Sequence, residues 1–189
     1  GVDGARAVVR ETRVTRVGKG ILWGNGDHPG TDPDAELVLE DCIVRDIGRR
    51  APEAQDGVRV LMRRCVIRDW GVGSRFTVRS FAAWAHDGAG IRAEDCVFWQ
   101  DHFLQAGLRG LVVDLANWIG WCWNRRDRNP LHWLLPGVCR GLTASQGGTV
   151  SAVRCYKNRW WIRLSGHEGP RMGKKEALAL MAELEGRLL

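Results

Sequence analysis

Hydrophobic and polar positions follow nearly the same pattern in two short stretches of the chain. Residues 37–46 read LVLEDCIVRD and residues 60–69 read VLMRRCVIRD. Each combines mostly apolar positions, two charged residues, a cysteine, two aliphatic residues and Arg-Asp. Alternation of this kind is typical of a strand with one buried face, and it directs Leu37, Leu39 and Leu61 inward. Each stretch therefore predicts two short strands joined at the cysteine.

The pattern recurs along the chain when Cys42 is used as a register mark. The residues at the mark are small or compact: Thr12, Cys42, Cys65, Cys96, Ala116 and Cys155. Neighbouring marks are 30, 23, 31, 20 and 39 residues apart. A spacing that is never below about twenty residues and is sometimes much longer is typical of a solenoid. Each coil has a constant short part, and loops of variable length are inserted on one side. We therefore predict an all-β parallel β-helix over residues 1–172.

A cysteine at the mark is explained by an inward-pointing bend. Coils of a parallel β-helix lie about 4.8 Å apart, so residues at equivalent positions stack into ladders. At a bend only a small side chain fits, and cysteine is a compact buried hydrophobe. We expect the four cysteines at the marks to be free thiols, and no spacing predicts a zinc site. Cys122 and Cys139 flank an irregular stretch, and a bridge between them stays open.

The last seventeen residues change character. In residues 173–189, Leu178, Met181, Leu184 and Leu188 recur at helical intervals, which predicts an amphipathic helix. A solenoid has unpaired strand edges at its ends, so this helix is expected to cap the coils or to pack along their side. The first strand, near residue 7, leaves an edge that we expect to pair with another chain or to belong to a longer natural protein.

Composition narrows the range of partners. The net charge is +6 and the pI is about 9.3, which favours a polyanionic partner, with solubility as the alternative explanation. No apolar run is long enough to span a bilayer, so no membrane partner is expected. Tryptophan and arginine interleave in residues 118–133, but nucleic-acid binding has no motif in support beyond charge. The histidines are scattered, and surface or loop roles are expected for His28, His86, His102, His132 and His167.

Four collinear stretches resemble polysaccharide lyase family 1, the pectate lyases. They are residues 14–27, 37–57, 58–71 and 80–100. The resemblance implies a right-handed parallel β-helix that acts outside the cell on an acidic polysaccharide. It also implies an N-terminally shortened chain, because the family has further coils before the strand at residues 7–9.

The resemblance carries functional residues to three positions. Arg50, in the sequence RRAP, falls on the catalytic arginine of the family. Lys19 falls on the lysine that contacts the substrate carboxylate, so it is expected in both catalysis and substrate binding. Gln55 stands where the family has a second substrate-holding arginine.

The implied chemistry is calcium-assisted β-elimination on polygalacturonate. Calcium and a lysine would neutralise the carboxylate beside the departing proton. An arginine acts as the base only where desolvation and nearby cations favour its neutral form. The calcium ligands are not located in this chain; Asp27, Asp32 and Asp34 are equally explained as a turn-rich loop. The alternative is a non-catalytic β-helix, without the calcium site, that binds carbohydrate or self-assembles.

Overall fold

The computed structural model describes residues 6–17, 21–23, 35–48, 50–71, 81–101, 140–160 and 162–188, and within them the chain forms parallel sheets and one C-terminal helix. Sheet A contains, in order, β1 (Arg6–Arg10), β4 (Glu36–Glu40), β7 (Arg59–Arg63), β10 (Gly90–Glu94), β13 (Thr149–Val153) and β15 (His167–Glu168). Sheet B contains β14 (Tyr156–Lys157), β11 (Val97–Trp99), β8 (Val66–Trp70), β5 (Ile43–Ile47) and β2 (Arg13–Thr15). Sheet C contains β12 (Arg140–Ala144), β9 (Phe81–Ala85), β6 (Glu53–Ala54) and β3 (Leu22–Trp23).

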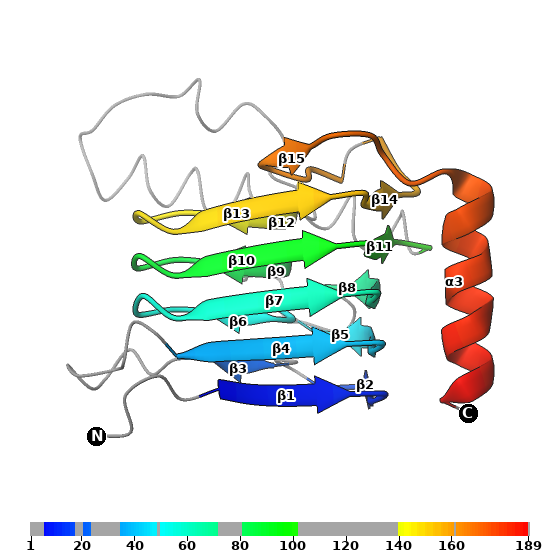
Figure 1. Ribbon diagram of the computed structural model, residues 1–189, viewed down its shortest axis with the longest axis horizontal. Coiled ribbons are helices and arrows are strands. Elements are labelled where there is room, and N and C mark those ends of the chain that lie inside the picture. Colours follow the sequence, from blue (N-terminus) through cyan, green and yellow to red (C-terminus); the bar gives the residue numbers. More distant parts are fainter. Residues whose placement is uncertain are drawn as a thin grey trace, which may run out of the picture.

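The chain visits sheets A, B and C in turn, and each strand pairs in parallel with its equivalent one turn later (Figure 1). The pairing β1–β4–β7–β10–β13 is continuous through sheet A. The expected all-β class is therefore confirmed as a parallel, solenoid-like fold. Side chains on the inner faces of the three sheets meet in one apolar cluster.

The corner between sheets A and B is built on the predicted cysteine column. Cys42, Cys65, Cys96 and Cys155 are buried free thiols, as expected. The Cys65 thiol lies 3.2 Å from the carbonyl oxygen of Arg63 and 3.4 Å from that of Leu39 in the preceding turn. The residues just before the marks all have φ between 47° and 53°: Glu11, Asp41, Arg64, Asp95 and Arg154. This left-handed residue makes the bend, and a thiol that binds local carbonyl groups fits inside it.

Two sequence expectations about the coils are wrong. β10 pairs directly with β13, so Cys96 and Cys155 occupy neighbouring turns and no turn marked by Ala116 lies between them. Residue 116 itself lies outside the described residues. Leu61 points outward, because Val60 and Met62 on either side of it are the buried residues of β7.

The corner between sheets C and A is a two-residue turn that repeats in three turns of the chain. Residues 56–57, 87–88 and 146–147 each have two positive φ angles, from 49° to 79°. The combination of Asp or Gln with Gly suits this conformation, because Gly adopts it without strain. The turns stack: the Gly57 N–H donates to the Asp87 carbonyl oxygen over 3.0 Å.

Helix α3 (Lys174–Arg187) runs along the side of the stack, beside the strands of sheet B (Figure 1). Its buried residues are Ala177, Leu180, Met181 and Leu184, which pack with apolar residues of sheet B. The predicted amphipathic helix is confirmed, except that Leu178 is 43% exposed and lies off the buried face. Within the described ranges, no helix has the length and apolar content that crossing a membrane requires.

Candidate functional site

The predicted residue Arg50 lies at the outer face of sheet C. There, Glu53 of β6 is opposite Trp84 of β9, which is opposite Thr143 of β12. The next residues along β6 and β9, Ala54 and Ala85, are fully buried in the core. Because successive side chains of a strand point to opposite faces, Glu53, Trp84 and Thr143 form a row on the outer face.

Arg50 is held by an anion and an aromatic ring. Its Nη1 forms an ion pair with Glu53 Oε1, and its guanidinium carbon is 4.1 Å from the centroid of Trp84. The Trp84 ring stacks in turn on Phe81, with centroids 5.1 Å apart. The Arg50 and Glu53 side chains are only 16% and 4% exposed, so both charges are largely removed from water. A pair of this kind persists because each partner compensates the desolvation of the other.

His86 extends the contacts of Arg50 into a chain of four polar side chains. Its Nδ1 is 2.6 Å from Asp87 Oδ2, and its Nε2 is 3.4 Å from Glu53 Oε1. Its ring stacks on Trp84 with the centroids 4.0 Å apart. Asp87, His86, Glu53 and Arg50 therefore form a continuous network across β6 and β9. His86 is buried, so a surface role is excluded, but it lies directly after β9 and outside any strand, which agrees with the expected loop position.

Aligning the coils on the Asp-Gly turns that follow the strands of sheet C would have revealed this network. Asp-Gly occurs at residues 56–57 and 87–88, and Glu53 and Trp84 each lie three residues before it. The cysteine marks do not reveal the match, because the chain between mark and turn differs in length from one coil to the next. The Asp-Gly turn lies at a constant distance from the strands of sheet C and therefore aligns their residues. The cysteines at the corner between sheets A and B do not.

The other two predicted residues are not joined to this network by any described contact. Gln55 follows β6 directly and is half-buried, and its backbone N–H donates to the Trp23 carbonyl oxygen over 3.1 Å. Lys19 lies outside the described residues. Of the three predicted positions, the structure therefore describes Arg50 and Gln55. Arg50 precedes β6 and Gln55 follows it, and the two residues make different contacts.

The described part of this face does not fit a calcium ion. Calcium takes six to eight oxygen ligands. Glu53 and Asp87 are engaged by Arg50 and His86, and the described residues contain no group of three or more potential metal ligands. Asp27, Asp32 and Asp34, considered as ligands from the sequence, lie outside the described residues.

Comparison with known proteins adds no assignment to this geometry. No protein-family model, curated protein or solved structure matches the chain. The functional inference therefore depends on the chain's own residues and contacts. Among these, the Arg50–Glu53–Trp84 arrangement bears most directly on the predicted chemistry.

Proposed function

We propose that the chain is a right-handed parallel β-helix related to the pectate lyases that binds acidic polysaccharide outside the cell without cleaving it. The observation that carries this proposal is the engagement of the Arg50 guanidinium by Glu53 and Trp84. The three repeating parallel sheets support the fold assignment. The residue pattern shared with the family supports the substrate class.

β-Elimination requires a base that accepts a proton beside a sugar carboxylate, and Arg50 is poorly prepared for that role. A guanidinium accepts a proton only after it has lost one. A neighbouring carboxylate and the face of an aromatic ring both stabilise the charged form. Nearby cations would have the opposite effect, whereas the Glu53 carboxylate and the Trp84 ring both favour the charged guanidinium. In this proposal Arg50 is a fixed cation that orders sheet C.

Two further features agree with binding without cleavage. Gln55 replaces the second arginine of the family motif, which removes a charged contact to the substrate. The net charge of +6 still attracts a polyanion. Long-range attraction of this kind raises the rate of encounter and weakens with added salt.

The test combines a cleavage assay with a binding assay. The protein is incubated with polygalacturonate and calcium, and unsaturated product is followed by its ultraviolet absorbance. We expect no product at high protein concentration and salt-sensitive retention of the protein in gels that contain the polymer. Product formation that is lost in Arg50→Ala would establish a lyase and overturn the proposal. Absence of both product and retention would exclude the polysaccharide as a ligand.

A further inference from the structure

The outer face of sheet A begins as three regular rows of side chains. In β1, β4 and β7, the first row alternates in charge through Arg6, Glu36 and Arg59, and the Arg6–Glu36 distance is 3.0 Å. The third row alternates as well, with Arg10 2.6 Å from Glu40. Alternation avoids like charges on directly opposed positions of stacked strands. The middle row is apolar: Val8, Val38 and Leu61.

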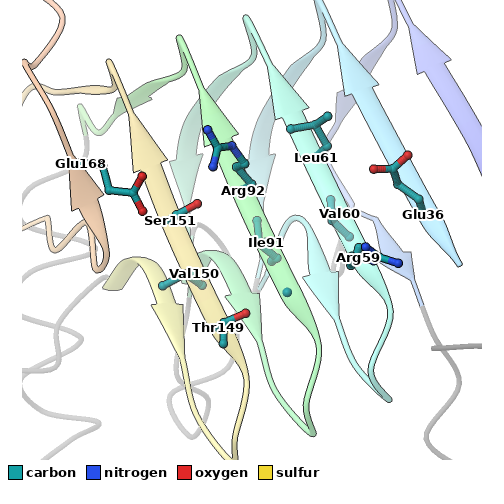
Figure 2. Close-up of a pocket in the computed structure, with 11 residues that line it drawn as sticks. Glu36, Arg59, Val60, Leu61, Ile91, Arg92, Thr149, Val150, Ser151 and Glu168 are labelled. Atoms are coloured by element: carbon teal, nitrogen blue, oxygen red, sulfur yellow. The ribbon is translucent and has the colours of Figure 1, made fainter. Parts of the chain in front are cut away.

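Two rows change at β10 and stay changed at β13. Gly90 stands beside Arg59, where alternation would place an acid, and Arg92 stands beside Leu61 in the row that was apolar. Thr149 and Ser151 of β13 follow them with hydroxyl groups. The change creates a groove of about 470 Å³ on this face. Figure 2 shows its side chains on five neighbouring strands, β4, β7, β10, β13 and β15.

The hollow at Gly90 is bordered by the Thr149 hydroxyl group and by the aliphatic part of the Arg59 side chain. Arg59 and Thr149 lie on the two strands that flank Gly90, and Arg92 lies two residues further along β10. The Arg92 Nε donates to Glu94 over 2.6 Å, so the guanidinium points along β10 away from Gly90 and its two Nη groups remain for other acceptors (Figure 2). The same hydrogen bond raises the pKa of Arg92, so the group stays charged. Guanidinium groups bind carboxylates through paired hydrogen bonds.

The ends of the groove are acidic. Glu36 lies on β4 at one end and Glu168 on β15 at the other. Carboxylates accept hydrogen bonds from sugar hydroxyl groups. The groove crosses five strands, which at about 4.8 Å per spacing is roughly 19 Å, longer than one sugar ring. Leu61 adds an apolar contact beside the charged groups.

We propose that this groove on sheet A binds a short segment of a carboxylate-bearing oligosaccharide. A sugar ring lies over Gly90 with its carboxylate on the Arg92 guanidinium, and the hydroxyl groups of adjoining sugars contact Thr149, Ser151 and the terminal glutamates. The ligand class rests on the proposed function. The location is independent of it, because the groove lies on a different sheet from Arg50.

Two variants test the groove by titration calorimetry with trigalacturonate and with its methyl ester. Gly90→Val fills the hollow, since a Cβ at Gly90 would lie 3.3 Å from Thr149 Oγ1 and 4.0 Å from Arg59 Cγ. Valine suits a strand, so folding is expected to persist. Arg92→Gln removes one guanidinium. We expect each variant to lose roughly tenfold in affinity for the acid, on the scale of one hydrogen bond to a charged group. We also expect the wild-type protein to bind the ester weakly.

Arg10→Gln is the matched control. Arg10 is also on sheet A and also paired with a glutamate, but it does not line the groove. The groove proposal would be overturned if affinity fell equally in Arg10→Gln and Arg92→Gln, or if it were unchanged in Gly90→Val. Polymer binding by the wild-type protein would still uphold the proposed function. A wild-type protein that binds neither the polymer nor trigalacturonate would overturn both. Urea unfolding midpoints identify any variant that fails through folding.

Discussion

Sheets A and B are formed by the same turns and meet at the same cysteine corner, yet their outer faces differ. Sheet B presents a row of Ile43, Val66 and Val97, which helix α3 covers. Sheet A presents rows of charged side chains, and none of the described elements packs over them (Figure 1). The inner positions therefore determine the coil, and the outer positions determine whether a face packs or remains available for a ligand.

Charge complementarity places α3 on sheet B. Glu183 of the helix is 2.6 Å from Arg64, and Glu185 is 3.0 Å from Arg68. Arg187 at the helix end is 3.3 Å from Asp41. These partly exposed pairs are individually weak, so the apolar row beneath supplies most of the stabilisation. The pairs fix the position of the helix along the sheet.

The largest expected effect comes from removing the apolar contact that distinguishes sheet B. Leu184 is fully buried between α3 and sheet B, and Leu184→Ala is expected to cost about 2–5 kcal/mol of unfolding free energy. The exposed Leu178 is the matched control, and Leu178→Ala is expected to change stability by less than about 0.5 kcal/mol. Urea unfolding measures both. Equal effects would mean that the helix does not depend on sheet B for its stability.

The second prediction concerns the corner that the two faces share. Cys96 is fully buried, and Cys96→Ala is expected to cost about 1 kcal/mol, on the scale of deleting one buried methyl-sized group. Thr12 occupies the same position in the first turn, where it is half-buried, and its Oγ1 donates to the Arg10 carbonyl oxygen over 2.8 Å. Thr12→Ala should therefore cost less. A larger loss at Thr12, measured by urea unfolding, would contradict the stacked-corner explanation.

The corner could be predicted from the sequence because burial restricts it to small residues in every turn. Cys42, Cys65, Cys96 and Cys155 all satisfied that restriction and lie in one column. Ala116 satisfied it too, yet the turns of Cys96 and Cys155 are direct neighbours, so a compact residue at a plausible spacing does not by itself place a turn between two others. Only the pairing of β10 with β13 separates the two cases.

The candidate sites were harder to predict, because outer positions carry no such restriction. Arg50 was found through a resemblance, but its partners Glu53 and Trp84 are 31 residues apart and meet only through the register of β6 and β9. The groove on sheet A depends on Gly90 and Arg92, which are recognisable only against the regular rows of the preceding strands. Each site is formed by residues from several neighbouring turns, so no single segment of the sequence contains it.

The third prediction tests whether the rows on sheet A stabilise the fold. Arg63 is 3.0 Å from Glu94 and directly opposite Glu40 on its other side. Arg63→Glu would place three like charges in line and is expected to cost roughly 0.5–1 kcal/mol. Arg63→Gln, which removes the attraction without adding repulsion, should cost less. Urea unfolding at low and high salt distinguishes the two, since salt screens exposed charges. An equal cost for both variants at all salt concentrations would contradict the electrostatic explanation.

The smallest expected effect is a dependence on pH that sheet A has through Glu94. Hydrogen bonds from Arg92 and then Arg63 lower the pKa of Glu94 below the ordinary value of 4.5. Because the folded pKa is the lower one, Glu94 stabilises the fold above about pH 4.5, and this contribution disappears as the pH falls through the folded value. Urea midpoints measured between about pH 6 and pH 3 should therefore decline less steeply for Glu94→Gln than for the wild-type protein. Parallel curves would show that this charged row of sheet A is too well solvated to contribute to stability.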